Sequence, residues 1–181
     1  STRGSCDPHY CYSVWLRHFS MLKNSESFQF PKTVAELGPG DSLGVGIAAL
    51  LSGCENYYAL DLVEYADAEM NLEIFDKLVD LFTEQPAIPL DNFPRVRPLL
   101  NSYEFPEEIA GKLDNSLAPA RLKEIRSEIE DPYNQDNKYI KYVAPWSNIA
   151  NVKDNSIDFV VTQAVLEHVD DLNEAYTSLC Q

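Results

Sequence analysis

The stretch Thr33–Gly53, TVAELGPGDSLGVGIAALLSG, decides the fold. Its first part predicts a short apolar strand over Thr33–Leu37, and its last part predicts a helix of small and apolar residues over Leu43–Leu51. Between them lies the turn Gly38–Gly40, whose glycines let backbone N–H groups approach a ligand where a Cβ would collide. A strand that enters a helix through such a turn is how α/β proteins build a nucleotide-binding site.

Two residues distinguish this turn from the G-x-G-x-x-G fingerprint of dinucleotide-binding proteins. Leu43 occupies the position of the third glycine. Glu36 precedes the turn, where its carboxylate would repel a pyrophosphate and would accept hydrogen bonds from an ammonium group. Those are the demands of S-adenosylmethionine, whose methionine end carries an amine and whose sulfonium is cationic. A plain tight turn or a helix C-cap is the structural alternative, and Asp41 and Ser42 are expected to cap the helix start.

Asp61 is the second candidate ligand residue. The run Tyr57–Asp61 predicts a second buried strand that ends in an acid, about 20 residues beyond the glycine turn, where an acid can bind both hydroxyl groups of a ribose. This role is common to dinucleotide and adenosylmethionine sites, so it supports a nucleoside without choosing between them. Alternatively, an aspartate at the end of a strand caps the next helix.

A third motif identifies a family. The segment Asp154–Asp170, DNSIDFVVTQAVLEHVD, resembles the fourth-strand motif of class I S-adenosylmethionine-dependent methyltransferases. That motif consists of a polar turn, S-F-D, an apolar strand and an L-x-H-hydrophobic segment. With V-A-E-L-G-P-G and Y-A-L-D in order before it, the chain resembles methyltransferases of the type 11-like group over residues 33–64 and 140–180.

The resemblance implies a Rossmann-like, mostly parallel α/β sheet flanked by helices, S-adenosyl-L-methionine as cofactor, and methyl transfer to a small-molecule acceptor. Within that site, Glu36, Gly38 and Gly40 would hold the methionine end of the cofactor, and Asp61 its ribose. The full set of implied cofactor-binding residues is Glu36, Gly38, Gly40, Ser42, Asp61, Leu62, Trp146, Ser147 and Gln163.

His168 is the candidate general base, because a histidine has an ordinary pKa near neutrality; a structural, hydrogen-bonded histidine is the alternative. Trp146 stands where the family usually has an acid that contacts adenine, so that contact does not carry over. Its indole would stack on the base or fill the core. Ser147 would lie near the adenine, and Gln163 beneath the sulfonium.

Composition limits the class of protein. The 181 residues suit one domain, and 45% hydrophobic with 24% charged residues is typical of a globular chain. The 29 Asp and Glu against 14 Lys and Arg give a net charge of −15, which disfavours nucleic acid and anionic membrane as partners and hints at a cationic or neutral acceptor. Neither the four cysteines nor the three histidines form a metal-ligand spacing, and no signal peptide or apolar span is seen, which favours the cytoplasm.

The rest of the chain is expected to frame this site. Amphipathic helices are predicted over residues 8–24 and 65–82, and further strands over 139–143 and 158–162. Residues 84–138 form a proline-containing insertion with helices at 104–113 and 119–129, interpreted as a lid over the carboxyl edge of the sheet or as a packing or dimerisation element. Only four strands of the family's seven are found, so the chain is expected to lack its C-terminal strands and to pair with a copy of itself. Residues 1–5 read as a cloning remnant.

Two other functions remain open. The first is a non-catalytic module that binds adenosylmethionine or adenosylhomocysteine, favoured by the missing strands. The second is an NAD-dependent oxidoreductase, disfavoured by Leu43 and Glu36.

Overall fold

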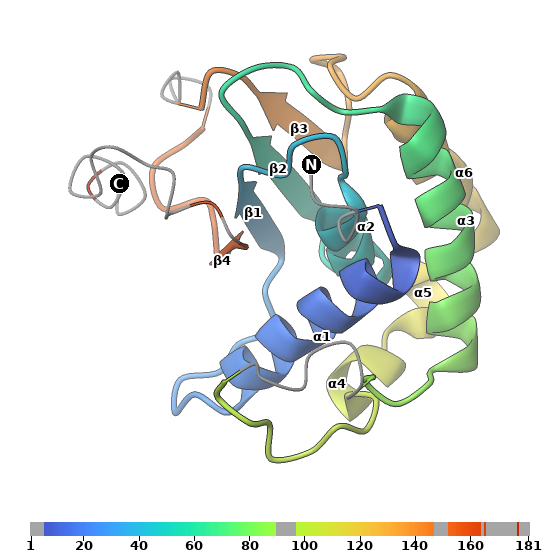
Figure 1. Ribbon diagram of the computed structural model, residues 1–181, viewed down its shortest axis with the longest axis vertical. Coiled ribbons are helices and arrows are strands. Elements are labelled where there is room, and N and C mark those ends of the chain that lie inside the picture. Colours follow the sequence, from blue (N-terminus) through green and yellow to red (C-terminus); the bar gives the residue numbers. More distant parts are fainter. Residues whose placement is uncertain (1–5, 90–96, 147–151, 164, 166–176, 178–181) are drawn as a thin grey trace.

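The computed structural model describes residues 6–89, 97–146 and 152–163, together with residues 165 and 177. Four parallel strands form one sheet in the order β3-β2-β1-β4. The predicted α/β fold with a parallel, Rossmann-like and incomplete sheet is therefore confirmed (Figure 1). The strands are β1 (Thr33–Leu37), β2 (Asn56–Leu60), β3 (Ile140–Val143) and β4 (Phe159–Thr162).

The described helices lie on one side of this sheet, to the right of and below the strands in Figure 1. Helices α1 and α2 lie next to the strands, α3 packs against both of them, and α6 packs against α3 and β3. Their bounds are α1 (Pro8–Lys23), α2 (Gly44–Leu51), α3 (Ala68–Glu84), α4 (Glu107–Ala110), α5 (Leu113–Ser116) and α6 (Pro119–Glu130).

Alternation along β1 divides its side chains between the two faces of the sheet. Val34 belongs to the large core under the helices, whereas Ala35 and Leu37 form a small cluster with Leu60 on the other face. The large core is centred on Trp15 of α1, which is completely buried. Strand β1 lies in the middle of the sheet, so its carboxyl end, where the glycine turn begins, is flanked by β2 and β4.

Local signals explain where the helices begin. The side chain of Asp67 accepts a hydrogen bond from the Met70 amide at 3.0 Å, so α3 starts at Ala68 rather than at residue 65 as predicted. Pro119 occupies the first turn of α6, as predicted. The single helix expected over residues 104–113 is instead two short helices, α4 and α5, separated at Gly111 and Lys112.

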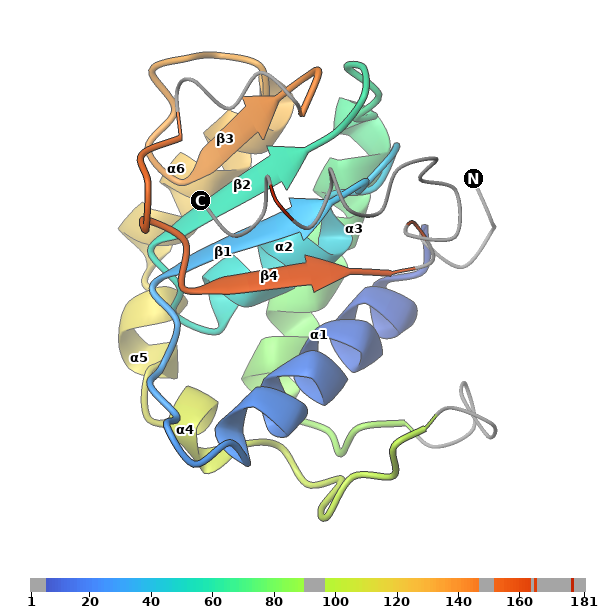
Figure 2. The same cartoon turned by 90° about the vertical axis from the view of Figure 1, so that its left-hand side faces the viewer.

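The helices of the insertion lie away from the carboxyl edge of the sheet. The Arg121 guanidinium, in the first turn of α6, donates to the carbonyl oxygens of Leu50 and Cys54 at 3.1 and 2.6 Å. These carbonyls lie in the last turn of α2 and in the short connection from α2 to β2, where the parallel strands begin. Figure 2 accordingly shows α4 and α5 beside the starting ends of the strands. The expectation that these helices form a lid over the carboxyl edge is therefore corrected for α4–α6.

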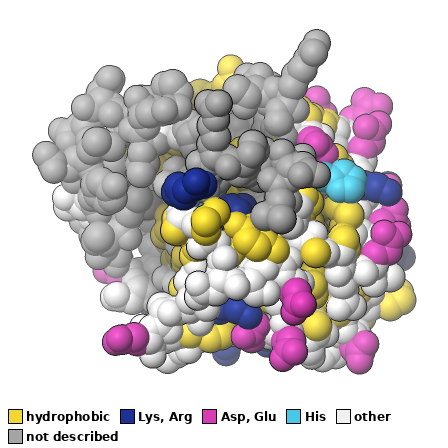
Figure 3. Space-filling view, turned by 60° about the horizontal axis from the view of Figure 1, so that its bottom comes forward, with side chains coloured by type: hydrophobic (Ala, Val, Ile, Leu, Met, Phe, Trp, Pro, Cys, Tyr) yellow, Lys and Arg dark blue, Asp and Glu magenta, His cyan; other side chains and the backbone are white. Residues whose placement is uncertain are grey.

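The surface carries charge of both signs. Figure 3 shows Asp and Glu side chains spread over the described part of one face, with Lys and Arg between them and no single acidic patch. Within the described ranges, no helix combines the length and apolar character that crossing a membrane would need.

Gly46 provides a test of this packing. A Cβ at Gly46 would lie 2.1 Å from the Tyr57 ring, which is fully buried between α2 and the sheet. We expect Gly46→Ala to lower the free energy of unfolding by about 2 kcal/mol or more in chemical denaturation, because neither the ring nor the helix has room to move.

Gly111→Ala is the matched control. A Cβ there would meet only the Glu107 carbonyl oxygen at an ordinary 3.6 Å, and Gly111 has a helical φ of −65°. Its stability should be unchanged or slightly higher. Equal unfolding free energies for the two variants would contradict the proposed packing of α2 on β2.

Candidate functional site

The glycine turn and the end of β2 meet at the carboxyl edge of the sheet. Gly38 and Gly40 both have φ of +70°, the left-handed conformation that favours glycine. The Gly40 amide donates to Oδ2 of Asp61 at 2.8 Å, and the Leu62 amide donates to Oδ1 of the same carboxylate at 2.7 Å. The Trp146 amide donates to the Asp61 carbonyl oxygen at 2.5 Å, so the loops after β1, β2 and β3 are tied together.

The two glycines differ in what surrounds them. A Cβ at Gly38 would lie 2.8 Å from both methyl groups of Val165, so the Val165 side chain covers this residue. A Cβ at Gly40 would meet no atom of the described residues within 4 Å. Open space therefore adjoins the turn at Gly40, next to the Asp61 carboxylate, where a ligand can reach the backbone.

Glu36 is a buried acid directly behind this turn. The Tyr57 hydroxyl donates to its Oε2 at 2.8 Å, and only 6% of the residue is exposed. Burial raises the pKa of Glu36 to about 7, against hydrogen bonds from Tyr57 and the Gly46 amide that favour the carboxylate, while the charge of Asp61 raises the pKa further. The side chain therefore titrates near neutral pH and senses the second carboxylate of the site.

The start of α2 is held by a residue far away in the sequence. The Leu43 backbone amide donates to Oδ1 of Asn71 at 2.8 Å. The side-chain Nδ2 of Asn71 in turn donates to the Asp41 carbonyl oxygen at 2.9 Å. The predicted cap by Asp41 and Ser42 is thus only partly realised. The Ser42 hydroxyl accepts from the Gly44 amide at 3.3 Å and lies 3.9 Å from the Cys11 thiol.

Helix α1 adds polar groups beside this edge. Burial raises the pKa of the Cys11 thiol to about 12, so this thiol is neutral and not a nucleophile at physiological pH. Burial lowers the pKa of the His18 imidazole, and the charge of Arg17 lowers it further. A hydrogen bond with the Gln163 side chain raises this pKa and so partly opposes the other two effects. At the end of β4, the buried hydroxyl of Thr162 has no hydrogen-bond partner in the described structure.

The predicted site residues fall into three groups. Those brought together at the ends of β1 and β2 are Glu36, Gly38, Gly40, Ser42, Asp61 and Leu62. Trp146 and Gln163 lie at the ends of β3 and β4: Trp146 packs on the small cluster around Leu60, whereas Gln163 is exposed beside His18. Ser147 and His168 lie outside the described residues, and their predicted roles stay predictions.

Sequence reasoning missed the residues that hold the site from behind, Tyr57, Asn71 and Cys11. The sequence carries no local signal for them, because the space that Gly46 leaves for the Tyr57 ring to reach Glu36 comes from the packing of α2 on β2. In the part of the chain that the structure describes, no group of three or more His, Cys, Asp or Glu residues is placed to bind a metal ion.

Comparisons with protein-family models, with characterised proteins and with solved structures give no match for this chain.

The buried Glu36 carboxyl predicts a pH effect on stability. Its pKa in the folded protein is raised from the ordinary 4.5 to about 7, so between these values the folded state keeps a proton that the unfolded state has lost. The contribution of Glu36 to stability should therefore fall as the pH rises through this window, by about 2 to 3 kcal/mol between pH 5 and pH 8. Glu36→Gln removes this titration, and the difference in unfolding free energy between the two proteins measures it. A difference that is independent of pH would contradict the buried position of Glu36.

Proposed function

We propose that this protein is an S-adenosyl-L-methionine-dependent methyltransferase that acts on a small-molecule acceptor. The observation that carries the proposal is the hydrogen bond between the Gly40 amide and Asp61, with Glu36 behind the turn and open space beside it. Two carboxylates and a glycine turn converge at the carboxyl edge, beside the point where the order of the sheet reverses between β1 and β4. In open α/β sheets, ligands bind in this position.

The residues present fit the proposed cofactor. The open space at Gly40 lets a ligand approach the backbone. A side chain at position 40 would occupy this space. The Asp61 carboxylate would accept hydrogen bonds from the ribose hydroxyls, either in place of the one from the Gly40 amide or in addition to it, because a carboxylate accepts several hydrogen bonds. Glu36 would hold the ammonium of the methionine end, a charge-assisted interaction that favours the ionised carboxylate.

Adenosylmethionine supplies a methyl carbon that its sulfonium already activates. The task of the chain is then to bind, orient and exclude water, since alignment of the reacting groups accounts for a large part of the barrier reduction. Gln163 stands at the end of β4 next to His18, and it would lie beneath the sulfonium. His168 stays the predicted general base, and the acceptor itself is not assigned.

A non-catalytic module that binds adenosylmethionine or adenosylhomocysteine is the second candidate. The described sheet ends at β4 on the side where acceptor sites of the resembled family usually draw further residues. Turnover of labelled adenosylmethionine distinguishes the two: binding of adenosylhomocysteine without transfer to any acceptor would support the module.

Calorimetric titration with adenosylhomocysteine tests the nucleoside site. Asp61→Asn should weaken binding by about tenfold or more, because the ribose loses a charged acceptor. Asp80→Asn is the matched control: Asp80 is an exposed acid on α3 whose ion pair with Lys77 spans 3.6 Å, and its variant should bind like the wild type. Tighter binding of NADH than of adenosylhomocysteine would favour the oxidoreductase instead.

The same titration should depend on pH through Glu36. Because its pKa in the free protein is about 7, adenosylhomocysteine should bind more weakly at pH 6 than at pH 8, with a proton released on binding at pH 6. In Glu36→Gln the affinity should be lower at pH 8 and flat across this range. If the wild type shows no proton release, Glu36 is not the group that meets the ammonium.

A further inference from the structure

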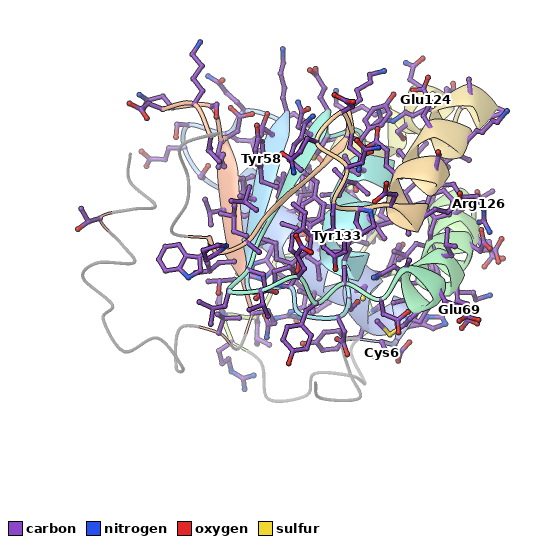
Figure 4. The ribbon with its side chains drawn as sticks, turned by 90° about the horizontal axis from the view of Figure 1, so that it is seen from above. Cys6, Tyr58, Glu69, Glu124, Arg126 and Tyr133 are labelled. Atoms are coloured by element: carbon purple, nitrogen blue, oxygen red, sulfur yellow. The ribbon has the colours of Figure 1, made fainter. Side chains whose placement is uncertain are left out.

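A cavity of about 380 Å³ lies beside the carboxyl end of β3, and the proposed function does not use it. Its volume falls within the range of small-molecule sites. The residues that matter for its chemistry are three tyrosines, Tyr58, Tyr133 and Tyr142, together with Glu64 and Lys141. In Figure 4, Tyr133 lies between the sheet and α6, whereas Tyr58 packs on the small cluster around Leu60, on the other face of the sheet.

Two of the tyrosine rings are fixed in place. The rings of Tyr133 and Tyr142 meet edge to face, with centroids 4.9 Å apart and planes at 76°. The Tyr133 hydroxyl donates to the Ala66 carbonyl oxygen at 3.2 Å. The Tyr142 hydroxyl donates to the Val63 carbonyl oxygen and accepts from the Tyr65 amide, both at 3.2 Å. Because both hydroxyl groups are engaged within the protein, the aromatic rings are what these residues offer to a ligand.

The lining of the cavity carries one carboxylate, Glu64, and one ammonium group, Lys141. Glu64 is exposed, and none of the ion pairs within the described residues involves it. Burial is the main cause that raises the pKa of Tyr133 and Tyr142. The negative charges of Glu64 and Asp61 raise both pKa values further, so both carboxylates act on these rings. The cation in the lining, Lys141, donates from its Nζ to the Asn137 carbonyl oxygen and is held at that position.

Two basic side chains outside the lining, on α6 and just before β3, form ion pairs of their own. Lys138 pairs with Glu124 at 3.4 Å and donates to the Tyr139 hydroxyl, and Arg126 on α6 pairs with Asp76. Glu64 is therefore the carboxylate of the lining that has no basic partner in the described structure. Electron-rich ring faces next to such a carboxylate attract a compact organic cation, whereas a neutral ligand of the same shape gains only packing.

We propose that this cavity binds an organic cation of the ammonium type, held by the rings of Tyr133 and Tyr142 and by the Glu64 carboxylate. The site stands on its own residues and does not depend on the proposed methyl transfer. It shares the loop after β2 with Asp61, so it adjoins the nucleoside site while using the outer side of β3, the edge strand of the described sheet.

Choline is a suitable probe, because its neutral isostere 3,3-dimethylbutan-1-ol has the same shape without the charge. In a titration of the full chain followed by amide NMR shifts, choline should bind saturably with shifts at the cavity residues. The neutral isostere should bind about tenfold more weakly or worse. Glu64→Gln should weaken choline binding about fivefold. The control Glu69→Gln, which removes an exposed acid on α3 outside the cavity, should leave it unchanged.

A gain-of-affinity variant separates the proposal from a folding defect. Lys141→Met removes the opposing charge of the lining and should tighten choline binding, a result that loss of structure cannot produce. Gly40→Asn, which places a side chain in the open space of the nucleoside site and tolerates a positive φ, should leave choline binding intact even if adenosylhomocysteine binding is lost. Equal binding of choline and its isostere, unchanged affinity in both Glu64→Gln and Lys141→Met, or no saturable binding at all would each overturn the proposal.

Discussion

The hydrogen bond from the Gly40 amide to the Asp61 carboxylate is the constraint on which the site depends. It links the turn after β1 to the end of β2, and the neighbouring bond from the Trp146 amide to the Asp61 carbonyl oxygen adds the loop after β3. Because the strands are parallel, all these loops leave the sheet at the same edge. One aspartate thus organises three loops around the place where open space meets the backbone at Gly40.

Buried polar groups under this edge give the site its electrostatic character. Glu36 lies under the helices and accepts a hydrogen bond from the Tyr57 hydroxyl. Burial raises the pKa of its carboxyl group to about 7. Such a group is costly in the empty protein, since a buried acid must either keep its proton or remain charged with few partners. A ligand with an ammonium group would supply the missing charge, which connects an unfavourable feature of the fold to binding.

The local elements could be predicted from sequence, and the long-range contacts could not. Strand β1 has the predicted bounds, because an apolar run followed by a glycine turn leaves little freedom. The pairing of Glu36 with Tyr57 depends on the register between β1 and β2 and on the space left by Gly46, neither of which the local pattern specifies. The Asn71 cap of α2 comes from 28 residues away. Of the two interpretations of the insertion, a lid or a packing element, the lid is wrong for α4–α6, because helical periodicity shows an apolar face without showing which surface that face covers.

The account is tested most directly by the backbone amide spectrum of the labelled protein during titration with adenosylhomocysteine. The amides of Gly40 and Leu62 both donate to Asp61, so a ribose bound by this carboxylate must change their environment. We predict that these two signals shift together and saturate with the ligand. Signals that stay in place at saturating ligand, or shifts confined to the cavity around Tyr58 and Tyr133, would contradict a nucleoside site at the glycine turn.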